Sequence, residues 1–427
     1  MRHRMRALAA TAAVALVAVA CAPPDPGGNT GGDDDTVTIG FLRPATGPNA
    51  APGRDMERGW KLYWKEHGEK VAGKQVKTVM EDTAGNPSIG LNKARELMTN
   101  SEADIIVGPM LANVGLAVAD AVNREKVPMV VPIVSADDLT QRKPLPYVVR
   151  MAGWSSSQTT HPLGEYAAVD RKYKTAVTMC SDYAFGHESC GGFTNTFTDE
   201  GGKIRKKLWN PLGTQEFGTY MAQIKQAKPD VVFTEQVGVD SVRFVKAWNE
   251  FGMNKTGIEL LTNETVVDQA ALRSIGEGAL GITSVGHFAD GRETPDTKKF
   301  VDAYNGEYDE FPSYYAAGMY TAARGVTKAL EDLDGDTSDR KKVVDTLKDV
   351  QLDETPFGPE YLDEQGNPVF NVYIREVQKR RGEVMNVPVK TYKEVGQFWK
   401  YPEEEFLDHP VYSKEYQGEG RWPQPTE

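Results

Sequence analysis

Short apolar strands alternate with helical segments along most of the 427-residue chain. The first such set comprises strands at residues 36–42, 76–80, 104–107 and 129–131 and helices at residues 55–67, 88–98 and 113–123. Strands that are wholly apolar and separated by helices predict a parallel sheet that is covered on both faces. We therefore expect an α/β protein with a doubly wound parallel sheet.

The same alternation begins again after a break at residues 153–157. The chain is too long for one ordinary core of about 100 to 200 residues, so we expect two lobes of similar construction. The second set comprises strands at residues 175–179, 203–208, 230–233 and 258–261 and helices at residues 190–199, 217–227 and 239–251, followed by helices at 300–308 and 313–333 and a strand at 370–375.

Chain that returns after the second sheet is expected to complete the first lobe, with three hinge crossings near residues 151, 288 and 357. Two lobes joined by several crossings form a cleft between them. The expected organisation is an N-terminal lobe of residues 36–151 and 288–356, a C-terminal lobe of residues 152–287 and 357–393, and an aromatic and acidic strap of residues 394–427.

The N-terminus carries an export signal. Residues 1–6 hold three arginines and no acid, and residues 7–20 are small and apolar, too short a run for a spanning helix. The run ends at Cys21 in a sequence that resembles a bacterial lipoprotein box, so we expect a signal peptide of residues 1–20, lipidation of Cys21 and a flexible tether over residues 21–35. Ala18 stands where such boxes prefer leucine, and cleavage at the same bond without lipidation remains an alternative. The expected location is the outer face of the bacterial cell membrane, or the periplasm.

Two cysteines remain after Cys21, namely Cys180 and Cys190. An exported chain meets an oxidising compartment, so we expect these two to form a disulfide. A reactive thiolate or a metal pair is the alternative. His187 and Glu188 lie between the cysteines, but the trio matches no zinc pattern, and we expect no metal site.

The charge balance excludes several partners. The chain has 49 basic and 61 acidic residues, and removal of the signal leaves a net charge of −15. A protein with this net charge repels phosphate backbones and anionic lipid head groups, so we expect no binding to nucleic acid and no attachment to a membrane through charge. The lipid on Cys21 is then the only expected contact with the membrane.

Catalytic and cofactor signatures are also missing from the sequence. Residues 276–281 satisfy G-x-G-x-x-G, but a helical segment precedes them and an extended one follows, the reverse of the dinucleotide-binding order. The sequence has no H-E-x-x-H and no G-x-S-x-G, so we expect neither an enzyme nor a cofactor. A catalytic triad assembled from distant segments remains open.

Short stretches of sequence point to a family. In order and spacing they resemble the branched-chain amino acid, or type I periplasmic-binding, family of substrate-binding proteins of ABC importers. The resemblance runs from about residue 36 to residue 377, and it rests on IGFL (39–42), ATGP (45–48), DTAGNP (82–87), IVGP (106–109), VPMVVP (127–132), YVVR (147–150), SDYAFG (181–186) and PDVVF (229–233).

The resemblance implies a Venus-flytrap binder that closes on a small solute and presents it to an ABC permease. Loops at the carboxyl ends of parallel strands meet in such a cleft, where helix N-termini favour an anionic group. We expect the ligand to contact Leu111, Ala112, Asn113, Ile133, Ser135, Ala136, Tyr183, Phe185, Gln236, Val237 and Glu264.

The family's carboxylate and ammonium contacts carry over only in part. Ser135 stands at the position of a carboxylate-binding threonine and Glu264 at that of an ammonium-binding glutamate, but Ala112 replaces a carboxylate-binding serine. Phe185 and Val237 replace two tyrosines. A branched-chain amino acid, an amide or urea-like solute and an aromatic carboxylate therefore all remain candidate ligands.

The expected function is that of a monomeric, extracytoplasmic solute-binding lipoprotein without chemistry of its own. Two alternatives from other classes remain: a bilobed sensor for a signalling partner and, less favoured, an exported hydrolase.

Overall fold

The computed structural model describes residues 35–380 and 382–419, and these form one compact unit. The predicted signal peptide, the lipidated Cys21, the tether up to residue 34 and the last eight residues of the predicted strap lie outside the described residues.

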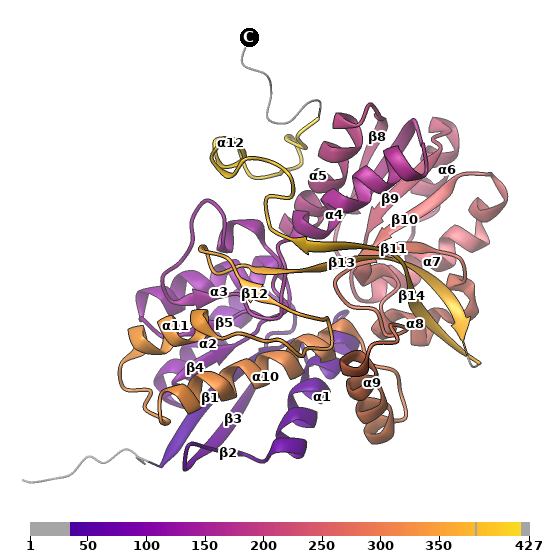
Figure 1. The fold of residues 1–427 in the computed structure, drawn as a ribbon. Helices are drawn as coiled ribbons and strands as arrows, with labels where there is room; N and C mark the ends of the chain where they lie inside the picture. The colour runs from indigo at the N-terminus through magenta and orange to yellow at the C-terminus, as the bar shows by residue number, and fades with distance from the viewer. Residues whose placement is uncertain (1–34, 381, 420–427) are drawn as a thin grey trace, which may run out of the picture. The chain divides into compact units, whose positions relative to one another are not determined.

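The first sheet has six strands in the order β2-β3-β1-β4-β5-β6, and all neighbours except β2 and β3 run parallel. Helices follow the strands as the alternation predicted (Figure 1). The elements are β1 (Thr36–Arg43), α1 (Ala50–His67), β2 (Lys70–Val71), β3 (Lys74–Asp82), α2 (Pro87–Thr99), β4 (Ile105–Val107), α3 (Ala112–Arg124), β5 (Met129–Val130) and β6 (Val148–Val149).

Three later helices pack with the first lobe: α9 (Pro295–Tyr308), α10 (Tyr314–Asp332) and α11 (Arg340–Asp349). Helix α10 packs against α1, and α11 contacts both α10 and β6. The contact between α1 and α10 is so close that a Cβ at Gly59 would lie 2.0 Å from the carbonyl oxygen of Ala316. The sequence keeps glycine there because any side chain would push the two helices apart.

The second sheet has eight strands. Strands β11, β10, β9, β7 and β8 run parallel in that order, β13 joins β11 antiparallel, and β12 and β14 both pair with β13. Its elements are α4 (Ser156–Glu165), β7 (Thr175–Ser181), α5 (Ala184–Asp199), β8 (Lys203–Asn210), α6 (Gly218–Ala227), β9 (Val231–Glu235), α7 (Val239–Glu250), β10 (Glu259–Asn263), α8 (Gln269–Ile275), β11 (Thr283–Gly286), β12 (Tyr361–Leu362), β13 (Pro368–Arg380) and β14 (Glu383–Val395).

The chain passes between the two lobes three times. The crossings follow β6, β11 and α11, and they span residues 150–155, 287–294 and 350–360. The predicted fold class, two α/β lobes with largely parallel sheets and three crossings, is confirmed. The reversed order around residues 276–281 is confirmed as well, since α8 precedes that segment and β11 follows it.

Helix α4, helix α11 and strand β14 were not predicted. Helix α4 is buried although its sequence, SSQTTHPLGE, is mostly polar, because it packs along α5 and its side chains bond to neighbouring segments. For example, Gln158 Nε2 donates to the carbonyl oxygens of Pro368 and Val395, both at 2.8 Å. A buried helix with polar partners on several sides shows no apolar stripe for a sequence pattern to detect.

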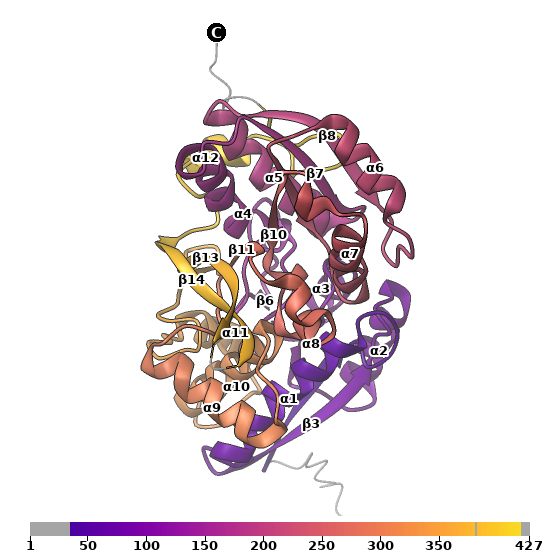
Figure 2. The same ribbon diagram turned by 90° about the vertical axis from the view of Figure 1, so that its right-hand side faces the viewer.

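Residues 396–419 lie against α4 and α5, with the short helix α12 (Glu403–Leu407) among them (Figure 2). Phe406 and Tyr412 are buried, and the Tyr412 hydroxyl lies 3.0 Å from Nε2 of His161 on α4. Arg142 donates to the carbonyl oxygens of Phe406 and His409, which ties this segment to the loop between β5 and β6.

Candidate ligand-binding site

A small cavity lies where loops of the two lobes meet. Its volume is about 10 Å³, and the residues around it follow the carboxyl ends of parallel strands in both sheets or begin α10. Loops at this end of doubly wound sheets are the usual place for a ligand. The lining residues are Met110, Leu111, Ala112, Ile133, Ser135, Trp154, Tyr183, Phe185, Val237, Thr265, Tyr314 and Tyr315.

The lobes touch each other around this cavity. The amide of Val239 on α7 donates to the carbonyl oxygen of Pro48 in the loop before α1, at 3.2 Å. Arg273 on α8 forms an ion pair of 2.5 Å with the fully buried Asp55 on α1. A solute of about ten heavy atoms is much larger than one water-sized space, so its entry requires the lobes to separate.

The first lobe contributes a helix N-terminus to the cavity. Helix α3 begins at Ala112, and no side chain of Leu111 caps it. The first amides of a helix carry a partial positive charge and attract anions. Beside it, the Ser135 hydroxyl lies 3.2 Å from Ser156 Oγ, which itself lies 2.6 Å from Oε2 of Glu188.

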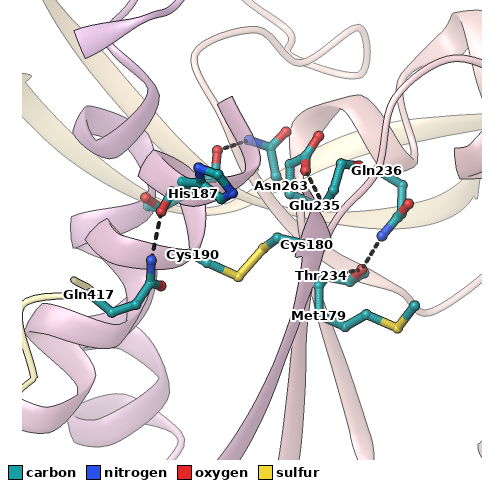
Figure 3. Close-up of a disulfide and its surroundings, with 12 residues drawn as sticks. Met179, Cys180, His187, Cys190, Thr234, Glu235, Gln236, Asn263 and Gln417 are labelled. Atoms are coloured by element: carbon teal, nitrogen blue, oxygen red, sulfur yellow. Dashed lines mark hydrogen bonds between the residues drawn. A yellow bond between two sulfur atoms is a disulfide. The ribbon is translucent and has the colours of Figure 1, made fainter. Parts of the chain in front are cut away.

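The second lobe contributes Tyr183, from the loop between β7 and α5, and Phe185, from the first turn of α5. Their rings meet edge to face with centroids 6.1 Å apart. The predicted disulfide between Cys180 and Cys190 is present, and it links the end of β7 to α5 on either side of this loop (Figure 3). The disulfide therefore closes a segment of the chain that includes both aromatic residues.

The cavity is aromatic and carries no charged side chain on its surface. Five of the lining residues are aromatic, namely Trp154, Tyr183, Phe185, Tyr314 and Tyr315. All five are less than 9% exposed. Such a lining suits a flat ring, while Ser135, Thr265 and the tyrosine and tryptophan polar atoms can orient its substituents.

Buried carboxyl groups lie behind the wall that the second lobe forms. Burial raises the pKa of Glu235, at the end of β9, to about 8. Burial likewise raises the pKa of Asp268 to about 7, and the side chain of Asp268 accepts a hydrogen bond from the amide of Tyr314. Burial and the nearby Asp137 raise the pKa of Glu188. A raised pKa means that each of these groups favours its protonated, neutral form.

Glu264 is engaged within the second lobe. One of its carboxylate oxygens lies 2.8 Å from Nδ1 of His287, and the other accepts from the His287 amide at 3.1 Å. Arg375 lies 3.6 Å from the same carboxylate. Glu264 is 1% exposed and is not among the residues that line the cavity.

The structure brings most of the predicted contact residues to the cavity. Leu111, Ala112, Ile133, Ser135, Tyr183, Phe185 and Val237 line it. Asn113, Ala136, Gln236 and Glu264 do not. The side chain of Gln236 bonds instead to Asn210 at 2.8 Å, and the carbonyl oxygen of Ala136 accepts from Arg150.

Sequence reasoning missed five lining residues: Met110, Trp154, Thr265, Tyr314 and Tyr315. Trp154 stands in the first crossing, and the two tyrosines begin α10 directly after its N-cap, Ser313. The adjacent pair Tyr314-Tyr315 after a helix-start signal was visible in the sequence. Its position beside the cavity was not, because α10 is far along the chain from the strands whose loops form the site.

The described part of the chain shows no group of three histidine, cysteine, aspartate or glutamate side chains that could hold a metal. Over the same residues, none of the helices is both long and apolar enough to span a membrane.

The fold and the cavity together define a two-lobed solute-binding protein of the type I periplasmic-binding class. Residues 36–382 match the model of the family described as periplasmic binding protein. The chain belongs to this family, and within it to the branched-chain amino acid group of ABC-importer substrate-binding proteins.

Among curated proteins, the chain is similar to the Leu/Ile/Val-binding protein homolog 6 of Brucella melitensis. The two are 29% identical over 85% of this chain and 93% of the relative.

Among solved structures, it is similar to an ABC-transporter solute-binding protein of Rhodopseudomonas palustris BisB5 in complex with 3,4-dihydroxybenzoic acid. That match has 31% identity and a TM-score of 0.81, and it covers 85% of this chain and 99% of the other. A second solute-binding protein from R. palustris, in complex with benzoate, is 25% identical with a TM-score of 0.78 and covers 84% and 97% of the two chains.

Proposed function

We propose that the chain captures a small aromatic carboxylate between its lobes and delivers it, chemically unaltered, to an ABC permease. The observation that carries the proposal is the lining of the cavity, in which five aromatic side chains and no charged ones surround the ligand space. The R. palustris proteins that resemble this chain are described in complex with benzoate-type acids, which supports the same ligand class.

The ligand carboxylate is assigned to the first lobe. There it meets the amides at the start of α3, near Ala112, and the hydroxyl of Ser135. The second lobe contributes Tyr183, Phe185 and Val237 to the lining, so it receives the ring. Contacts to both lobes at once are what a ligand needs to favour closure, because a ligand that binds only one lobe shifts no equilibrium between open and closed forms.

A branched-chain amino acid is the second candidate, favoured by the Leu/Ile/Val-binding relatives. Its ammonium group would need an acidic partner, and the predicted one is Glu264. One carboxylate oxygen of Glu264 accepts from the His287 amide, the other lies 2.8 Å from His287 Nδ1, and Arg375 lies nearby. A ligand without a cation therefore fits the cavity better.

The energetics allow this role. A ligand of about ten heavy atoms can contribute up to about 15 kcal/mol at the limit known for very small ligands, and micromolar binding requires about 8 kcal/mol. The difference is available for ordering side chains and for closing the lobes.

Isothermal titration calorimetry tests the proposal with four solutes: benzoate, 4-hydroxybenzoate, leucine and isoleucine. We expect micromolar or tighter binding of at least one aromatic acid and binding of the two amino acids that is weaker by about tenfold or more. Tight binding of leucine or isoleucine with no response to either aromatic acid would reverse the assignment of the ligand class.

A charge placed at the start of α3 tests where the carboxylate binds. Ala112→Asp puts a carboxylate against that of the ligand, and we expect about a hundredfold loss of affinity for the aromatic acid. Asn123→Asp is the matched control, because it adds the same charge eleven residues further along α3 and keeps an oxygen that can accept from the Tyr147 amide. Equal effects of the two substitutions would contradict the placement.

We also propose export and lipid anchoring through Cys21. The support is the sequence of residues 1–21, with its arginines, its short apolar run and its cysteine after small residues. Cys21→Ala is expected to release the protein from the membrane fraction, and mass spectrometry of the N-terminal peptide should find a diacylglyceryl group only on the unaltered chain. Finding Cys21 unmodified in the mature protein would contradict lipid anchoring and would indicate an exported protein that is not attached to the membrane.

A further inference from the structure

Trp154 brings an unused hydrogen-bond donor to the cavity. Its side chain lines the cavity and is 1% exposed, and its Nε1 has no hydrogen-bond partner among the described residues. An indole N–H can only donate, and a donor that is buried without an acceptor is unfavourable. A ligand that enters the cavity beside Trp154 is one source of the acceptor that this donor lacks.

Aromatic contacts hold the Trp154 ring in place. The imidazole of His287 lies 4.6 Å from the Trp154 ring between centroids, and the ring of Tyr314 meets it edge to face at 4.9 Å. His287 in turn stacks on Phe357 at 4.5 Å. Trp154, His287 and Phe357 come from the first, second and third crossings, so the indole is packed among all three hinge segments.

His287 is itself fixed in position. Glu264 accepts hydrogen bonds from the amide of His287 and contacts its Nδ1, as described above. Because the ring beneath Trp154 is held in this way, the indole has little freedom to turn toward another acceptor. A fixed donor discriminates more sharply between ligands than a mobile one.

Two acidic side chains lie near Trp154, but neither presents an unpaired charge to the cavity. Glu264 lies behind Trp154 through His287, and Asp268 bonds to the amide of Tyr314, which also contacts Trp154. The ligand carboxylate is assigned to the amides at the start of α3, which leaves Trp154 to meet another group of the ligand. A neutral oxygen on the far side of the ring can instead accept the indole proton.

We propose that Trp154 determines specificity within the aromatic acids, by donating its Nε1 hydrogen to a ring hydroxyl oxygen para to the carboxylate. This inference rests on the proposed function, because it requires an aromatic carboxylate in the cavity. The aromatic side chains of the cavity favour any ligand with a flat ring. The Trp154 donor adds a preference for benzoates with a para hydroxyl group over benzoates of equal size that lack this group.

The test compares 4-hydroxybenzoate with 4-methylbenzoate, which has nearly the same size and lacks the acceptor. Calorimetry is carried out on the unaltered protein, on Trp154→Phe and on Trp64→Phe. Trp64 is the matched control, because it is also buried with an unpartnered Nε1 but lies in α1, outside the ligand cavity. We expect the unaltered protein and Trp64→Phe to prefer the hydroxylated acid by about tenfold, and Trp154→Phe to reduce this preference about fivefold or more.

A purely structural role of Trp154 gives a different result. In that case Trp154→Phe weakens both acids equally and leaves their ratio unchanged, which would overturn the inference. An unaltered protein that binds both acids equally well also overturns it, while the proposed function stands. If the unaltered protein binds neither acid, the proposed function fails and the inference fails with it.

A second measurement needs no substitution. With ¹⁵N-labelled tryptophan, one indole N–H resonance is expected to move further downfield with 4-hydroxybenzoate than with 4-methylbenzoate, since Trp154 is the only tryptophan among the residues that line the cavity. Indole spectra that respond identically to the two acids would also overturn the inference.

Discussion

Removal of Arg273 should destabilise the protein strongly, because it leaves a charge buried between the lobes. Arg273 on α8 binds Asp55 on α1 with two hydrogen bonds, of 2.5 and 3.1 Å. Asp55 is fully buried, and its nearby charge holds the pKa of Arg273 above its ordinary value although burial opposes this. Loss of one partner from such a pair typically costs about 3–5 kcal/mol.

Arg273→Met is therefore expected to lower the free energy of unfolding by about 3–5 kcal/mol in urea denaturation. The substitution keeps a long side chain, so the main change is the loss of the countercharge for Asp55. Adding Asp55→Asn should recover part of this loss, because the double variant leaves no buried charge.

The neighbouring Arg54 provides the control. Its guanidinium is half exposed and lies 3.8 Å from Glu310, so Arg54→Met should change stability by less than about 1 kcal/mol. The reasoning would be refuted if Arg273→Met cost no more than Arg54→Met, or if Asp55→Asn made the Arg273→Met protein still less stable.

Three further predictions concern the stability of the fold. Burial raises the pKa of Glu235 from its ordinary 4.5 to about 8, so the folded state binds the Glu235 proton more tightly than the unfolded state does. The free energy of unfolding should therefore fall between pH 5 and pH 8 by up to about 1.4 kcal/mol per pH unit because of this group. Glu235→Gln should remove this pH dependence in urea denaturation measured from pH 5 to pH 8.5. Gly59→Ala should cost about 3 kcal/mol in urea unfolding because its Cβ would meet the backbone of α10, whereas Gly306→Ala in α9, where nothing lies within 4 Å, should be neutral or stabilising. Replacing Cys180 and Cys190 by serine should lower the free energy of unfolding by about 2–4 kcal/mol, and an unchanged midpoint would contradict a structural role of the disulfide.

Most of the fold followed from periodicity in the sequence. The central parallel strands are apolar on both faces, as in residues 231–233 of β9, and such strands are easy to recognise between helices. Helix α4 was not predicted because its buried side chains are mostly polar. They are stabilised by hydrogen bonds to neighbouring segments, such as the bond from Gln158 to the carbonyl oxygen of Pro368. A pattern based on hydrophobicity has no means of detecting a helix whose burial depends on hydrogen bonds.

The sequence predicted mainly those lining residues that come directly after strands of the two sheets. Ile133 and Val237 come shortly after strands, and the carboxyl ends of parallel strands were expected to face the cleft. Trp154 and Tyr314 reach the cavity from a hinge crossing and from a helix that returns late in the chain. Their positions depend on how the lobes pack, which no local sequence pattern records.

Small-angle X-ray scattering with and without saturating 4-hydroxybenzoate tests most directly whether the lobes trap a solute. If the cavity among Ser135, Trp154 and Phe185 receives the acid by opening and closing, the radius of gyration should fall when the ligand binds. A radius of gyration that stays the same at a concentration where calorimetry shows full occupancy would contradict capture by closure.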